Sequence, residues 1–211
     1  MTSMRLFAAI TPPDEVLDHL ETALTMLGDV PAAPERDDRR RSRGTRATRA
    51  AHRSPWTPRS TWHLTVAFFG SVPDGSLPDV EEQVGAAVAE VEPFTVQLSG
   101  AGTFRGTVLW VGVGGETAPL TDTMHALAEV HSEITTLEDR RERNRAHLTI
   151  SRSPAIDAAT VAHALSVYRG PEWTVDAIEL VESELGAGEQ GHPVHTVVAT
   201  VALGRSAHRR A

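Results

Sequence analysis

The apolar positions of the chain alternate between strand-like runs and helical spacing. The run Arg5–Ile10 is short and mostly apolar, which is typical of a buried strand. From Val16 to Leu27 apolar side chains recur every three or four positions, and Gly28 follows them. This pattern predicts an amphipathic helix with a glycine stop. Trp62–Phe69 again has the character of a strand, and Pro78–Val91 carries valines on one helical face.

The rest of the chain continues this alternation. The pattern predicts strands at Phe94–Leu98, Thr107–Val113, His147–Ser151, Trp173–Leu185 and Val194–Leu203, and helices at Leu120–Ile134 and Asp157–Tyr168. Each half of the chain then has the order helix, strand, helix, strand, strand. An internal repeat of this kind predicts two lobes related by an approximate two-fold axis. We therefore expect residues 1–211 to form a single domain of two pseudo-symmetric lobes, each built from helices and strands.

A tetrapeptide is repeated at equivalent points of the two halves. It reads His63-Leu-Thr-Val66 in the first and His147-Leu-Thr-Ile150 in the second, 84 residues later. Successive side chains of a strand point to opposite faces. The histidine and the threonine of each copy therefore share one face, and the aliphatic residues can enter the core of each lobe. If the two lobes oppose these faces, the cleft holds two imidazoles and two hydroxyls without a carboxylate.

These residue types suit phosphodiester chemistry. One neutral imidazole and one protonated imidazole supply a general base and a general acid near neutral pH. The hydroxyls of Thr65 and Thr149 can donate hydrogen bonds to anionic phosphate oxygens. Arg152 points to the opposite face by simple parity, but it would reach a phosphate if the strand ends at Ser151. Two histidines could also bind zinc, but neither tetrapeptide contains an acidic residue to complete a metal site.

The aromatic residues near the motifs have weaker assignments. Trp56 and Phe69 lie near the first motif, where packing is the expected role and base stacking is the alternative. Trp110 lies in an apolar strand and is expected in the core. Phe104 belongs to a glycine-rich loop and is a candidate for stacking on a base.

Two further histidines lie near the end of the chain. His192 and His195 flank a turn between two predicted strands. Both could line the cleft.

Composition narrows the classes of function. The chain has 211 residues, a net charge of −8 and no cysteine, so disulfides and thiolate nucleophiles are excluded. It contains no lysine, which excludes Schiff-base chemistry and a Walker A loop. It has no apolar run near the roughly 20 residues that span a bilayer. We expect a cytoplasmic protein with no membrane association.

Basic charge is concentrated in one segment. Nine of the 20 arginines lie between Arg36 and Arg59, and prolines bracket them. We expect residues 31–59 to form a mobile, arginine-rich loop. Its role is either that of a solvated linker or that of an electrostatic surface for nucleic acid, and the sequence favours neither.

The sequence resembles the two-histidine phosphoesterase superfamily, and within it the LigT-like RNA 2',3'-cyclic phosphodiesterases. The resemblance rests on the paired motifs and on stretches that flank them: Met4–Ile10, Trp56 with His63–Gly70, Gly102–Phe104 with Val108–Gly112, His147–Arg152 and Ile178–Ser183. It implies a bilobal α+β fold with antiparallel sheets and flanking helices. It also implies hydrolysis of RNA 2',3'-cyclic phosphate ends to 2'-phosphates without a metal or other cofactor.

The resemblance further implies roles for individual residues. His63 would be the proton donor and His147 the proton acceptor, although the near-symmetric halves leave this order open by themselves. Thr65 and Thr149 would hold phosphate oxygens, and phosphate affinity would also depend on arginine, with Arg152 the candidate. The arginine-rich segment before Trp56 is longer than the family pattern.

Three hypotheses follow for the function. The main one is a monomeric hydrolase that acts on RNA with 2',3'-cyclic phosphate ends and also catalyses reversible 2'-5' RNA ligation. The second keeps the chemistry but takes a small substrate, such as a cyclic nucleotide or a 2'-5' oligonucleotide. The third is a non-catalytic RNA-binding protein, against which the intact histidine and threonine of both motifs argue.

Overall fold

The fold is known from a computed structural model, which describes residues 2–28, 54–134 and 145–204. Most of the predicted arginine-rich loop, residues 31–59, lies outside the described residues. No helix within the described ranges is long and apolar enough to cross a membrane.

The described elements follow the predicted alternation closely. Their bounds are β1 Ser3–Ile10, α1 Asp14–Met26, β2 Leu64–Pro73, α2 Leu77–Val88, β3 Phe94–Phe104, β4 Val108–Gly115, α3 Thr117–Ile134, β5 His147–Ser151, α4 Ala158–Ala164, β6 Arg169–Val175, β7 Ala177–Glu184 and β8 Val194–Ala202. Short 3₁₀ turns at Arg59–Thr61, Asp74–Ser76 and Glu189–Gly191 come just before β2, α2 and β8.

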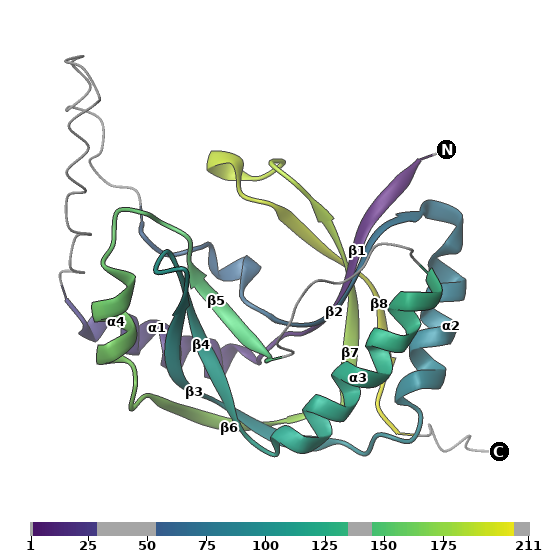
Figure 1. Ribbon diagram of the computed structural model, residues 1–211, viewed down its shortest axis with the longest axis horizontal. Coiled ribbons are helices and arrows are strands. Elements are labelled where there is room, and N and C mark those ends of the chain that lie inside the picture. The colour runs from purple at the N-terminus through teal and green to yellow at the C-terminus, as the bar shows by residue number, and fades with distance from the viewer. Residues whose placement is uncertain (1, 29–53, 135–144, 205–211) are drawn as a thin grey trace, which may run out of the picture.

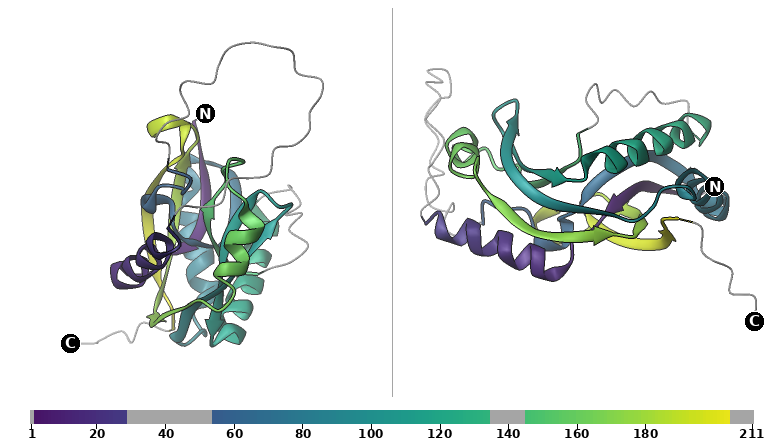
Figure 2. Two further views of the ribbon diagram at one scale, coloured as in Figure 1. Left: turned by 90° about the vertical axis from the view of Figure 1, so that its left-hand side faces the viewer. Right: turned by 90° about the horizontal axis from the view of Figure 1, so that it is seen from below.

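The eight strands form one antiparallel sheet, which confirms the predicted α+β class. The strand order is β6-β3-β4-β5-β2-β1-β7-β8 (Figure 1). Figure 2 shows from two further directions how strongly this sheet curves. At its centre, β5 and β2 share a single pair of partner residues, Leu148 and Leu64. The sheet is therefore divided into two lobes of four strands that meet at this pair.

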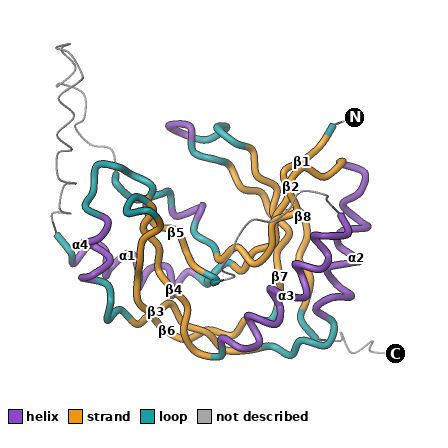
Figure 3. Tube along the Cα trace, viewed as in Figure 1, coloured by secondary structure: helices purple, strands orange, loops and turns teal. Residues whose placement is uncertain are grey.

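The helices cover the outer faces of the two lobes. Helix α1 packs against β6 and α4 against β3 and β4, while α2 and α3 pack against each other and against β8 and β2 (Figure 3). Each lobe thus contains one helix from each half of the sequence. Strands are exchanged in the same way, because β3 of the first half pairs with β6 of the second half, and β7 of the second half pairs with β1 of the first. The repeat predicts the two lobes, but the lobes do not coincide with the halves.

The prediction of a single strand over Trp173–Leu185 is wrong in one respect. It consists of two strands, β6 and β7, which pair with different lobes. Asp176 separates them, and its carbonyl accepts a hydrogen bond of 2.8 Å from the backbone N–H of Leu203. The chain crosses from one lobe to the other at this residue, and its apolar pattern continues because both strands bury one face.

The last residues of the predicted loop are tied to the folded core. The backbone N–H of Thr57 donates to the carbonyl of Ile150 at 2.9 Å, and the Ser151 hydroxyl donates to the carbonyl of Pro55 at 2.6 Å. Arg59 forms ion pairs of 2.6 to 3.0 Å with three carboxylates of α1: Asp14, Asp18 and Glu21. The part of the loop from residue 54 onward therefore runs alongside β5 and leads directly into the first motif.

Replacing Leu64 by alanine tests the importance of the central pair. The Leu64 side chain is fully buried, so we expect its truncation to lower the free energy of unfolding by about 2 to 5 kcal/mol. Urea unfolding monitored by tryptophan fluorescence measures this loss. Val167→Ala, at a side chain that is 86% exposed, should change stability by less than about 0.5 kcal/mol. Equal effects for the two variants would contradict the assignment of Leu64 to the core.

Candidate active site

The two repeated tetrapeptides meet at the junction of the lobes. Leu64 and Leu148 are antiparallel partners, so extending their register by one residue places His63 opposite Thr149, and Thr65 opposite His147. All four of these polar side chains line one cavity of about 650 Å³. The alternating aliphatic residues are buried on the other face, as the strand pattern predicts. A ligand in this cavity would therefore contact two imidazoles and two hydroxyls at once.

Each imidazole is anchored by backbone two residues earlier in the chain. His147 Nδ1 donates to the carbonyl of Arg145 at 2.8 Å. The His63 ring hydrogen-bonds to the backbone of Thr61, and its Nε2 lies 3.1 Å from the Thr65 hydroxyl. A nitrogen that donates to a carbonyl fixes the tautomer of the neutral ring, so Nε2 is the atom that can exchange a proton with a ligand. The pseudo-symmetry of the fold thus extends to the way both rings are held.

The cavity has a basic lining in an acidic protein. β5 ends at Ser151, and the next residue, Arg152, lines the cavity together with Arg5 of β1 and His192. No carboxylate occurs among the described residues that line it. This distribution of charge favours an anionic ligand. Within the described ranges, no three residues of the metal-ligating types are grouped closely enough to hold a metal ion.

Aromatic rings lie in the cavity lining and next to it. Phe104, 43% exposed at the end of β3, packs edge-on against His147 with ring centroids 4.9 Å apart. Trp110 contacts both of these rings, so it lies beside the cavity rather than in the core that its position in an apolar strand predicts. In the lining itself, the Arg5 guanidinium stacks on the Phe68 ring at 4.4 Å from its centroid. The Phe104 and Phe68 rings are therefore the candidates for contact with a nucleobase.

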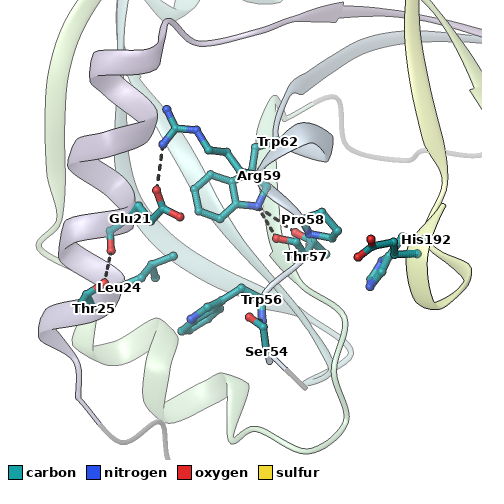
Figure 4. A pocket seen from close by; sticks show the side chains of 11 residues that line it. Glu21, Leu24, Thr25, Ser54, Trp56, Thr57, Pro58, Arg59, Trp62 and His192 are labelled. Carbon is teal, nitrogen blue, oxygen red and sulfur yellow. Dashed lines mark hydrogen bonds and ion pairs between the residues drawn. The ribbon is translucent and has the colours of Figure 1, made fainter. Parts of the chain in front are cut away.

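A smaller hollow of about 330 Å³ adjoins the cavity beside α1. Figure 4 shows its lining, in which Arg59 pairs with Glu21 and the Trp62 indole donates to Thr57. Thr57 and His192 line both the hollow and the larger cavity.

The two aromatic residues near the first motif have the predicted packing role. Trp56 lines the smaller hollow and packs against the core. Phe69 is fully buried. Packing is thus confirmed for both residues.

A third imidazole lies beside the first motif. His192 and His195 both line the cavity, as predicted, but the sequence gives no sign that His195 contacts His63. His195 of β8 contacts the His63 ring with centroids 5.1 Å apart, and Phe7 of β1 contacts both rings. His195 alternates with exposed residues along the last strand, and this pattern indicates at most that it lies near the cleft. The contact itself depends on the pairing of β7 with β1 and with β8, which hydropathy does not specify.

Burial has a large effect on the protonation of His63. Together with the smaller effects of the nearby positive charges of His195, His147 and Arg152, it lowers the pKa of His63 from 6.5 to about 4. The hydrogen bond to Thr61 acts in the opposite direction. His63 is therefore neutral at neutral pH in the unliganded protein.

This low pKa predicts a loss of stability in acid. Between pH 6.5 and about 4 the unfolded chain binds a proton at His63 that the folded protein does not bind, so the free energy of unfolding falls as the pH falls. The full difference corresponds to about 3 kcal/mol. We expect His63→Gln to lose correspondingly less stability than the wild type over this range in urea titrations. Parallel pH dependence of the two proteins would contradict the low pKa.

Comparisons with known proteins agree on the fold and the family. A crystal structure of TT0787 from Thermus thermophilus is 26% identical, with a TM-score of 0.68, and the match covers 97% of this chain and 100% of that one. E. coli LigT in complex with 3'-AMP is 19% identical, with a TM-score of 0.65 and coverage of 96% and 99%, and this likeness concerns the fold alone.

Two sequence comparisons place the chain more closely. An RNA 2',3'-cyclic phosphodiesterase from Geobacillus stearothermophilus is 36% identical over 67 residues, which is 30% of this chain and about a fifth (21%) of the length of that protein. The family model of the 2'-5' RNA ligase superfamily matches residues 30–187, which include both histidine motifs. Since this match covers well over half of the chain, the chain belongs to the 2'-5' RNA ligase superfamily.

Proposed function

We propose that this protein hydrolyses RNA 2',3'-cyclic phosphate ends to 2'-phosphomonoesters by acid–base catalysis with two histidines. The observation that carries the proposal is the single cavity lined by His63, Thr65, His147 and Thr149, with both imidazoles anchored in the same way. Membership of the superfamily and the resemblance to a named RNA 2',3'-cyclic phosphodiesterase support it.

The proposed reaction is an in-line displacement at phosphorus. A water molecule attacks the phosphorus while His147 takes one of its protons. The bond from phosphorus to the 3'-oxygen breaks, and His63 protonates that oxygen, which leaves a 3'-hydroxyl and a 2'-phosphate. Thr65 and Thr149 donate hydrogen bonds to the non-bridging oxygens, where negative charge increases in the transition state. Arg152 supplies a further positive charge for the phosphate.

A donor role for His63 places a condition on substrate binding. With a pKa of about 4, the ring carries almost no proton at neutral pH in the unliganded protein. An anionic phosphodiester beside the ring stabilises the imidazolium, so substrate binding has to raise the pKa of His63. The substrate would thus create the acid that then protonates its leaving group.

Ligation follows from the same arrangement. If the 5'-hydroxyl of a second RNA end replaces water, His147 deprotonates it and the product is a 2'-5' phosphodiester. We propose this ligation as a second activity of the site. It uses the same base and acid as hydrolysis. In the reverse direction, cleavage of the 2'-5' linkage, the two histidines exchange these roles, as microscopic reversibility requires.

Removal of either histidine tests the main proposal. An oligoribonucleotide with a 2',3'-cyclic phosphate end is incubated with the protein in EDTA, and the product end is mapped as a 2'- or 3'-phosphate. We expect a 2'-phosphate, with kcat about 10²- to 10⁴-fold lower in His63→Ala and in His147→Ala.

His125→Ala, at an exposed position on α3, is the matched control and should retain the wild-type rate. An intact cyclic end after incubation with the wild type would refute the RNA-end proposal. Opening of small cyclic nucleotides in its place would favour the smaller substrate class.

The threonines provide a separate prediction. Valine has almost the shape of threonine but cannot donate a hydrogen bond, so Thr65→Val and Thr149→Val should each lower kcat by about 10²-fold or more. Thr174→Val, at an exposed site on β6, should have no effect on kcat. Steady-state kinetics on the cyclic-phosphate oligonucleotide separate kcat from KM. An effect on KM alone would limit the threonines to ground-state binding.

The order of donor and acceptor can be tested by NMR. Imidazole ¹⁵N shifts of His63 are followed against pH with and without a nucleoside 2'-monophosphate, the product of the reaction. We expect the pKa of His63 to rise from about 4 toward neutrality in the complex. If it stays near 4, His63 cannot be the donor at neutral pH, and the two histidines exchange roles.

A further inference from the structure

His195 has a place in the structure that the proposed reaction does not explain. Its ring lies at 70° to the His63 ring, with centroids 5.1 Å apart, and at 72° to Phe7, with centroids 5.2 Å apart. Phe7 in turn contacts His63 at 4.8 Å. Phe7 of β1, His195 of β8 and His63, which comes just before β2, thus form a mutually packed set of three rings.

His195 also separates two cavities. Together with His63 it lines the large cavity of the candidate active site, and the same two rings line a second cavity of about 440 Å³. His195 Nδ1 is buried and has no hydrogen-bond partner among the described residues. A phenyl ring would fill the same space without an unpaired polar atom. Packing alone therefore does not account for an imidazole here.

We propose that His195 is a positioning residue that fixes the His63 ring and controls when that ring takes up a proton. This proposal rests on the proposed acid–base role of His63. Packing against His195 and Phe7 restricts the orientation of His63, so that its Nε2 stays beside Thr65. A proton on His195 places a positive charge against His63, so the two rings resist being protonated together until an anion enters the cavity.

The charged groups around His63 support this arrangement. After burial, the charge of His195 is the largest cause that lowers the pKa of His63, ahead of His147 and Arg152, and burial lowers the pKa of His195 as well. Arg5 lines the active-site cavity, while the second cavity is lined by three charged residues: Asp14, Arg59 and Glu179. Among the described residues of the basic lining, His195 is the one whose ring contacts His63.

Two substitutions separate positioning from charge. His195→Phe keeps an aromatic ring but removes the titrating group, whereas His195→Ala removes both. We expect His195→Phe to raise the pKa of His63 in the unliganded protein by about one unit, measured by ¹⁵N NMR titration. The alkaline limb of the pH–kcat profile for opening the cyclic phosphate, where the proton donor loses its proton, should move in the same direction. His195→Ala should in addition lower kcat about tenfold or more, and His195→Phe should restore most of that loss.

His192→Phe is the matched control, because His192 precedes β8 on the same hairpin and lines the same cavity. It should leave the pKa of His63 unchanged. An unchanged titration of His63 and an unchanged pH profile in His195→Phe would overturn the charge role. A wild-type kcat in His195→Ala would overturn the positioning role. If His195→Phe does not fold, His195→Asn gives the same charge test.

The two arms also separate this inference from the proposed function. The titration of His63 needs no substrate, so it tests the coupling of the two rings even if the wild type opens no cyclic phosphate. Suppose that the wild type opens the cyclic RNA end, but the pKa of His63 is the same with and without His195. This result would refute the inference and leave the proposed function in place.

Discussion

The pairing of Leu64 with Leu148 is the constraint on which the candidate site depends. It is the single point at which the two four-stranded lobes are joined edge to edge within the described sheet. Both side chains are fully buried, so the polar residues on either side of each leucine must face the other way. A slip of one residue in either strand would put an imidazole into a core and a leucine into the cavity. The register of the sheet therefore determines which side chains line the cavity, and each lobe contributes one of the two motifs.

The cavity gathers groups of like charge, which repel one another when no anion is bound. It gathers histidines and two arginines without a carboxylate among the described lining residues, although the whole chain has a net charge of −8. Burial and neighbouring positive charge keep His63 neutral until something anionic enters. The same groups that would destabilise the unliganded protein in acid would stabilise a bound phosphodiester. The acid sensitivity of the site and its affinity for an anion thus have the same physical origin.

Much of this could be read from the sequence because the hydrophobic pattern is strong and repeated. The mixture of helices and strands and the bounds of β5 follow from this pattern directly, and the pattern predicts the helix bounds to within a few residues. The exchange of strands between the lobes does not follow, since a pattern of buried positions does not specify which strands pair with each other. For the same reason the continuous apolar run 173–185 conceals the change of lobe at Asp176. The apolar pattern also misplaces Trp110 in the core. Alternation defines the two faces of a strand, but it does not say which face packs against the core.

The sequence by itself determined that each motif presents its histidine and threonine on one side of a strand, because side-chain alternation is a local property of the backbone. It also determined that an anionic substrate suits the motifs, because the chemistry of imidazole and hydroxyl groups is local as well. Tertiary structure alone decided that the two motifs meet and that Arg152 turns toward the cavity where β5 ends. It also decided that His195 and Phe7 enclose His63. These contacts join residues that are far apart in the chain, so they depend on strand register and packing, which no local pattern specifies.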